Sequence, residues 1–198
     1  NQLIGYLNSN GINKDNLQFI EDDYNSIWMR DYGANTIYQN DVDALLLVDW
    51  IYNRPRPDDD VLPERVASYV GVPFYTTTVA PYDLVHTGGN FMSDGFGTAF
   101  SSKLVVEENG PFGNYNQTVK TEVEISTIME EFMGIENYVL MDVLPYDGIH
   151  HIDMHMKLLD EETLLIGEYP SGQADGPQIE ANLCLLYTAD AADEATRA

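Results

Sequence analysis

The chain has 198 residues, with 33 acidic and 9 basic side chains, a formal net charge of −24 at pH 7, and one cysteine. A length of this order suits one domain, and a composition of 44% hydrophobic and 11% aromatic residues indicates a folded chain rather than a disordered one. The negative charge argues against nucleic acid or an anionic membrane as partner, since both would repel the chain. The sequence contains no run of 18 apolar residues, so no membrane span is predicted.

The pattern of apolar residues predicts helices and strands in alternation, with no linker that divides the chain. Helices are predicted over 61–70 and 118–133, each followed by a glycine, and another ends near Gly11. The acids Asp58–Asp60 and Glu107-Glu108 indicate solvated surface. A mixed α/β fold follows, with strands predicted over 17–20, 36–38, 44–50, 74–79, 91–92, 98–100, 103–106, 138–141, 151–158 and 164–167.

Both ends of the sequence differ from natural termini. The chain starts at Asn1 inside a helical pattern, so we expect part of the N-terminus to be missing. Residues 184–194 (CLLYTADAADE) closely resemble the translation of a transposon-type sequencing adapter, with Ala189 in place of serine. We therefore expect a native domain over 1–183 and a non-native tail over 184–198; a genuine alanine-rich helix is the alternative.

The first cluster that could do chemistry is WMRDYG at 28–33. Asp31 could bind a cation, and Trp28 could stack on one. A structural salt bridge or a turn cap is the alternative.

The second cluster places Arg54 and Arg56 between prolines, directly after a strand. Because proline stiffens the loop, the two guanidinium groups are presented at a fixed spacing that suits a carboxylate ligand. The alternative is that both pair with the neighbouring acids Asp58–Asp60.

The third cluster is His150-His151-Ile152-Asp153-Met154-His155. On the predicted strand, His151, Asp153 and His155 share one face, which sets a proton-transfer group beside an anion and suits acid–base work on a cation. A mononuclear metal site built from these three residues and a set of merely hydrogen-bonded histidines remain alternatives. The Gly88-Gly89 pair could allow a close backbone approach to a ligand, although such pairs usually form turns.

Together, four ordered motifs resemble the bacterial guanidino-group deiminases, which include the Porphyromonas-type peptidylarginine deiminases and agmatine deiminases. The motifs are WMRDYG (28–33), DWIYNRPRP (49–57), HTGGNFMSDGFGTAFSS (86–102) and HIDM (151–154), and the resemblance covers residues 15–183. It implies a partial pentein, an α/β propeller of ββαβ units, with roughly the N-terminal half to three-fifths of the ring. It also implies a bacterial protein, with a secreted or cell-envelope location slightly favoured over a cytoplasmic one.

The resemblance also implies roles for individual residues. Asp31 and Asp153 would hold the substrate guanidinium, His151 would be the general acid and then the base, and Trp28 would line the pocket. Arg54 and Arg56 would grip the C-terminal carboxylate of a peptide. No metal or organic cofactor is implied.

The implied activity is hydrolysis of a peptidyl or C-terminal arginine to citrulline and ammonia. Alternatives are an agmatine deiminase, which makes N-carbamoylputrescine for putrescine biosynthesis, and a non-catalytic arginine-binding module. The chain departs from the family at Ala34, where proline is usual, and at the nucleophile, since Cys184 lacks the His-Cys context of the family's cysteine. We therefore expect the 198-residue chain to be inactive by itself.

Overall fold

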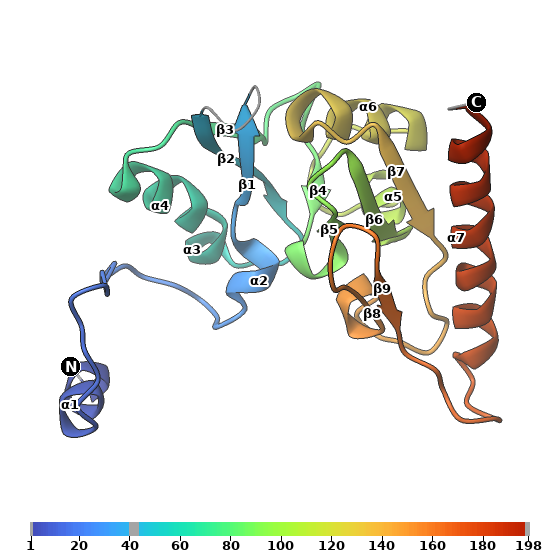
Figure 1. Ribbon diagram of the computed structural model, residues 1–198. Helices are drawn as coiled ribbons and strands as arrows, with labels where there is room; N and C mark the ends of the chain where they lie inside the picture. Colours follow the sequence, from blue (N-terminus) through green and yellow to red (C-terminus); the bar gives the residue numbers. More distant parts are fainter. Residues whose placement is uncertain (1, 40–43, 197–198) are drawn as a thin grey trace.

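The computed structural model describes residues 2–39 and 44–196, with side chains described up to residue 187. After an N-terminal helix, the chain forms a first unit in the order strand, strand, helices, strand (Figure 1). In this unit β1 pairs antiparallel with β2, and β2 pairs parallel with both β3 and the short strand β4. Its elements are β1 (Asn35–Gln39), β2 (Ala44–Tyr52), α3 (Pro57–Asp60), α4 (Leu62–Val70), β3 (Phe74–Thr77) and β4 (Val85–His86).

A second unit repeats this order, and a third begins in the same way. In the second unit β5 pairs antiparallel with β6, and β6 pairs parallel with β7; β8 and β9 then form an antiparallel hairpin that a helix follows. The chain therefore contains two ββαβ units and the ββα part of another, which confirms the predicted mixed α/β class. These elements are β5 (Met92–Ser93), β6 (Thr98–Ser102), α5 (Leu104–Asn109), α6 (Glu122–Met133), β7 (Asn137–Met141), β8 (Met156–Leu158), β9 (Leu164–Ile166) and α7 (Gly176–Thr196).

The hydrophobic core lies where successive units meet. One cluster joins Trp50 of β2 to Ile125 and Met129 of α6, and a second joins Phe100 of β6 to Met156 of β8. Fully burying a side chain of this size stabilises the fold by roughly 1.5–3 kcal/mol. The units are thus held together by the side chains that each could not bury alone.

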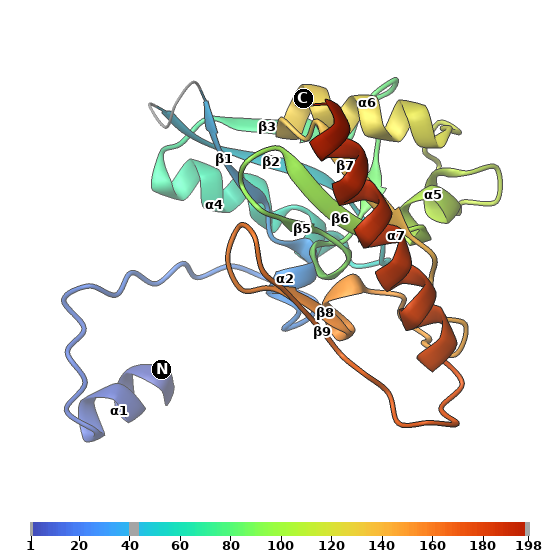
Figure 2. The same ribbon diagram turned by 45° about the vertical axis from the view of Figure 1, so that its right-hand side comes forward.

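The segment before the first unit lies apart from this core. Helix α1 (Gln2–Ser9) and the irregular chain that follows extend away from both units in Figures 1 and 2. At the other end, α7 runs along the edge of β7 and continues without a break through residue 184. The predicted boundary between a native domain and a foreign tail lies inside this helix and stays a prediction. Of the described helices, none has the length and apolar content needed to cross a bilayer.

Local sequence signals set the ends of helices α4 and α6. Gly71 ends α4 and Gly134 ends α6, both in the left-handed conformation, with φ of 74° and 67°. Helix α6 begins later than predicted because Thr121 and Glu124 form a capping box, in which each side chain accepts the other's backbone N–H.

Three predicted strands are wrong. Residues 17–20 are irregular, and residues 103–106 lie mostly in α5, where Val105 is fully buried in the core and overrides its strand preference. The stretch 151–158 forms a strand only from Met156 onward, because residues 152–154 make a 3₁₀ turn. The shared face predicted for His151, Asp153 and His155 therefore does not exist.

A buried carboxyl group in β2 makes the stability of the fold depend on pH. Asp49 is only 6% exposed, and burial, with Asp60 nearby, raises its pKa from 3.8 to about 8. A raised pKa in the folded state means that stability is full below the unfolded pKa and falls as pH rises through the folded one. Unfolding should therefore become easier between about pH 4 and pH 8.

Asp49→Asn should remove this penalty. At pH 8 we expect the variant to exceed the wild-type free energy of unfolding by about 3 kcal/mol, and at pH 5 by less than half of that. Urea unfolding at the two pH values measures this, with the exposed Glu161→Gln as the control. A gain of equal size at both pH values would contradict the ionisation of Asp49 as its cause.

Candidate active site

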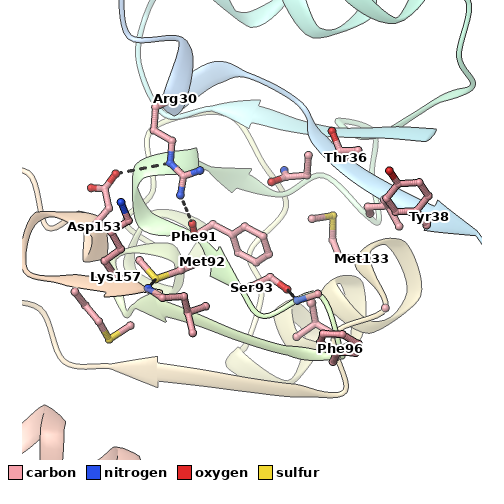
Figure 3. A pocket seen from close by; sticks show the side chains of 18 residues that line it. Arg30, Thr36, Tyr38, Phe91, Met92, Ser93, Phe96, Met133, Asp153 and Lys157 are labelled. Carbon is pink, nitrogen blue, oxygen red and sulfur yellow. Dashed lines mark hydrogen bonds and ion pairs between the residues drawn. The ribbon is translucent and has the colours of Figure 1, made fainter. Parts of the chain in front are cut away.

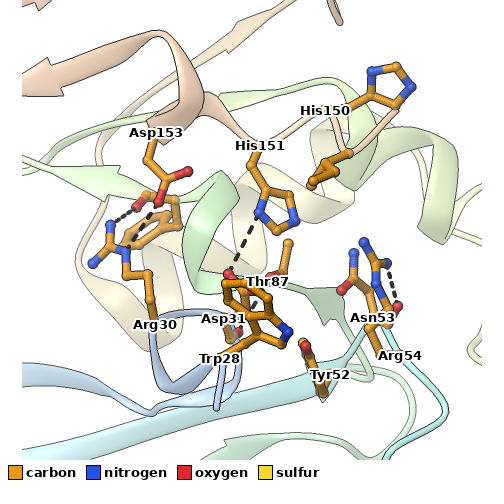
Figure 4. Close-up of polar contacts among 12 residues, drawn as sticks. Trp28, Arg30, Asp31, Tyr52, Asn53, Arg54, Thr87, His150, His151 and Asp153 are labelled. Carbon is orange, nitrogen blue, oxygen red and sulfur yellow. Dashed lines mark hydrogen bonds and ion pairs between the residues drawn. The ribbon is translucent and has the colours of Figure 1, made fainter. Parts of the chain in front are cut away.

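Four segments from different units meet at one place, shown in Figure 4. They are the short helix α2 (Met29–Tyr32), the residues that end and follow β2, the 3₁₀ turn η1 (Gly88–Asn90) and the 3₁₀ turn η2 (Ile152–Met154). Turns η1 and η2 pack against one another, and α2 packs on η1. Together they gather residues that are more than 100 positions apart in the sequence.

A buried acid holds the loop that leads into α2. Asp59 is fully buried, and its carboxylate accepts the backbone N–H groups of Asn25 and Ser26 at 2.7 and 3.0 Å and the Ser26 hydroxyl at 2.7 Å. Asp60 accepts the backbone N–H of Tyr52 at 2.7 Å. The interpretation of Asp58–Asp60 as solvated surface is therefore wrong for Asp59 and Asp60, since their carboxylates accept backbone N–H groups beside the site.

Asp31 of α2 faces His151. Asp31 Oδ1 lies 3.6 Å from His151 Nδ1, and both side chains are mostly buried. Since a carboxylate only accepts, this contact favours the tautomer with the proton on Nδ1, and His151 Nε2 has no hydrogen-bond partner within the described residues. Burial lowers the pKa of His151, while the Asp31 and Asp153 carboxylates oppose that shift. An imidazole held in this way can exchange a proton through Nε2.

Asp153 points away from that pair and toward Arg30. Its Oδ2 lies 3.7 Å from Arg30 Nε, and Arg30 Nη2 donates to the Phe91 carbonyl oxygen at 2.9 Å. Burial raises the pKa of Asp153, whereas His151 and Arg30 lower it. The turn η2 thus sends His151 and Asp153 in different directions, in place of the single strand face that was predicted.

Two glycines make the close packing of these groups possible. A Cβ on Gly89 would lie 2.3 Å from His151 Nδ1 and 2.7 Å from Asp31 Oδ1, and a Cβ on Gly88 would lie 1.9 Å from the Arg30 carbonyl oxygen. The sequence suggested a close backbone approach at this pair. The structure shows that the groups approached belong to the protein itself.

The remaining predicted residues lie near the Asp31–His151 pair and have different partners. The Trp28 side chain is 55% exposed beside Asp31 (Figure 4). Arg54 Nη1 donates to the Asn53 carbonyl oxygen at 2.7 Å, and its charge contributes to the lowered pKa of His151. Arg56 Nη1 donates to the Tyr52 hydroxyl at 3.0 Å and the Ser26 hydroxyl at 3.2 Å. Arg54 therefore faces the site, while Arg56 binds the surrounding loops.

The sequence did not predict the hydrogen bonds that hold Asn53, the residue before Arg54. Glu108 accepts both its hydrogen bonds from the Asn53 amide, at 2.8 and 3.1 Å, and burial raises its pKa to about 7. The Tyr115 hydroxyl donates to the Asn53 carbonyl oxygen at 2.6 Å. The interpretation of Glu107-Glu108 as solvated is thus wrong for Glu108. No pattern in the sequence links Asn53 to residues more than 50 positions away.

A cavity of about 1060 Å³ opens on the Asp153 side of these residues (Figure 3). Arg30, Asp153 and Lys157 give it charged groups, and the rest of its lining mixes polar side chains such as Ser93 with apolar ones such as Met133. Within the part of the chain that the structure describes, no three His, Cys, Asp or Glu side chains converge as ligands for a metal ion. His151, Asp153 and His155 are therefore not arranged as a ligand cluster in this structure.

Two ββαβ units followed by the start of a third are a segment of a pentein ring, the fold of guanidino-group deiminases. The chain belongs to the Porphyromonas-type peptidyl-arginine deiminase family, whose model matches residues 3–196. A protein of Mycoplasma mycoides provisionally named agmatine deiminase is 26% identical over 152 residues, which cover 71% of this chain and 38% of that protein.

Solved structures show the same fold. The agmatine deiminase of C. jejuni matches with a TM-score of 0.70 at 18% identity, over 88% of this chain and 51% of that one. A protein provisionally named peptidyl-arginine deiminase matches with a TM-score of 0.70 at 21% identity, over 85% and 50%. The chain thus spans about half the length of these structures and 38% of the curated relative, and the predicted partial pentein is confirmed.

Proposed function

We propose that the whole protein, of which this chain would form part, hydrolyses the guanidino group of an arginine that carries a free carboxylate. The observation that carries this proposal is the gathering of two carboxylates near His151: Asp31 contacts it, and Asp153 lies close enough to affect its pKa. A guanidinium is planar and cationic, so two carboxylates can orient it and offset the loss of its hydration.

The proposed reaction needs a proton carrier and a nucleophile. A thiol gives its proton to His151 and adds, as the thiolate, to the central guanidino carbon; the carbon–nitrogen bond then breaks, and ammonia leaves with that proton from His151. His151 then takes a proton from water, whose oxygen attacks the same carbon and displaces the thiolate. The products are ammonia and a ureido group.

The one cysteine of this chain does not fit the role of that nucleophile. Cys184 is exposed on α7, which packs against β7, whereas His151 lies beside α2 and η1. We therefore propose that a cysteine elsewhere in the whole protein supplies the thiolate and that the 198-residue chain alone releases no ureido product. Turnover by this chain that Cys184→Ala abolishes would contradict that assignment.

Arg54 supports arginine as the substrate. Its guanidinium sits at the rim of the site, close enough to affect His151, and a carboxylate bound there would form a charge-assisted hydrogen bond. Agmatine is the second candidate, because the curated relatives carry the name agmatine deiminase, and it has no carboxylate for Arg54 to bind.

Arg54→Ala in the whole protein should separate the two substrates. We expect KM for a peptide with C-terminal arginine to rise about 10-fold or more, since a hydrogen bond between charged groups contributes roughly 1.5–3 kcal/mol, while KM for agmatine changes less than about twofold. Steady-state kinetics with both substrates measures this. The control is Arg65→Ala, which removes an arginine of α4 that forms an ion pair with Asp22. Equal effects of Arg54→Ala on both substrates would remove the carboxylate-binding role and favour agmatine.

A further inference from the structure

We infer that Arg30 is a positioning residue for Asp153: it anchors one oxygen of that carboxylate and keeps it negatively charged, so that the other oxygen is left for a cationic substrate. This inference rests on the proposed function, in which Asp153 binds a guanidinium.

The guanidinium of Arg30 is itself held in place. Its Nη2 donates to the carbonyl oxygen of the buried Phe91 at 2.9 Å, which leaves Nε directed at Asp153 Oδ2 at 3.7 Å (Figures 3 and 4). The backbone of Arg30 packs on Gly88 so closely that a Cβ there would lie 1.9 Å from its carbonyl oxygen. Both ends of Arg30 are thus fixed by the η1 turn and the residue that follows it.

This arrangement connects α2 to η2 by two neighbouring pairs. Arg30 contacts Asp153, and the next residue, Asp31, contacts His151. Arg30 contacts Asp153 Oδ2, and no described residue donates a hydrogen bond to Asp153 Oδ1. Oδ1 is therefore the oxygen that can receive a substrate N–H group.

The charges around Asp153 explain why it needs a permanent cation. Asp31 from α2 and partial burial both raise the pKa of Asp153, while His151 and Arg30 lower it; Lys157 of β8 lines the same cavity. His151 is a weak support, because burial lowers its own pKa and so disfavours its charged form. Arginine stays charged at any pH in proteins, so Arg30 provides the counter-charge when His151 is neutral.

The direct test is a carboxyl carbon NMR titration of Asp153 in the full 198-residue chain without substrate. Arg30→Met should raise the pKa of Asp153 by about one unit, as expected for the loss of one nearby opposite charge. Arg30→Lys should restore part of this shift. Lys103→Met is the matched control, since it also removes one cation from an exposed ion pair, here with Asp142, where β6 and β7 end. An Asp153 pKa that Arg30→Met leaves unchanged, or that Lys103→Met shifts equally, would overturn the inference.

Kinetics of the whole protein then separate positioning from general damage. For Arg30→Met, KM should rise more at pH 6 than at pH 8, because a raised pKa of Asp153 reduces the fraction of its charged, cation-binding form more at the lower pH. A KM increase of the same size at both pH values would contradict the inference. Because the titration involves no substrate, its result stands even if the wild-type protein hydrolyses no guanidino compound, an outcome that would instead remove the proposed function.

Discussion

Gly89→Ala should separate His151 from Asp31 and lower the activity of the whole protein at least about 100-fold. The added methyl group would lie 2.3 Å from His151 Nδ1 and 2.7 Å from Asp31 Oδ1, distances that real Cβ contacts do not reach. One of the two side chains must therefore move, and a displacement of about 1 Å at a reacting group costs on the order of 100-fold in rate.

The same variant should leave a signature in the isolated chain. Since the Asp31 carboxylate raises the pKa of His151, separating the two should lower that pKa further, and Asp31→Asn should do the same without a steric change. An NMR pH titration of the four histidines measures it. Gly148→Ala is the control, because a Cβ there meets no atom within 4 Å. If neither Gly89→Ala nor Asp31→Asn lowers the pKa of His151, the contact between Asp31 and His151 does not raise that pKa.

His151→Asn should lower the rate of the whole protein about 1000-fold, with a much smaller change in the affinity for a guanidinium ligand. The reason is that His151 moves protons in the proposed reaction, a role that contributes roughly 100- to 10,000-fold, whereas Asp31 and Asp153 hold the ligand. Rate measurements combined with calorimetric binding of agmatine or arginine distinguish the two steps.

The neighbouring histidine gives a matched control for that variant. His150 adopts a φ of 61°, a conformation that asparagine tolerates well, and its backbone N–H is bonded to Asp147 at 2.9 Å, so His150→Asn should fold normally and keep most of the activity. If His150→Asn and His151→Asn lose the same rate, the loss reflects the loop rather than proton transfer.

The sequence predicted most of the regular elements because their signals are local. The apolar run of β2, the glycine that ends α4 and the Asp94-Gly95 hairpin between β5 and β6 all depend on residues within a few positions. The strand predicted at 103–106 failed because tertiary packing decided its conformation: α5 buries Val105 and joins Asn109 to both backbone groups of Val85 at 2.8–2.9 Å.

The site was predictable in its residue types but not in its geometry. Motifs singled out Asp31, His151 and Asp153, yet the alternation of a strand placed His151 and Asp153 on one face, whereas the 3₁₀ turn sends them to different partners. The role of Arg30 could not be read from the sequence, since its partners Phe91 and Asp153 lie 61 and 123 positions away. Contacts over such distances depend on the packing of whole units.

The most direct test of the proposed site is product analysis with the whole protein. A peptide with C-terminal arginine and agmatine are incubated separately with the wild type and with Asp31→Asn, and ammonia and the ureido product are quantified. The proposal predicts equimolar ammonia and ureido product from the wild type with at least one substrate, faster with the peptide, and a loss of about 1000-fold in Asp31→Asn. No ureido product from the folded wild type, or undiminished turnover by Asp31→Asn, would contradict the assignment of Asp31, His151 and Asp153 as a guanidino-hydrolysing site.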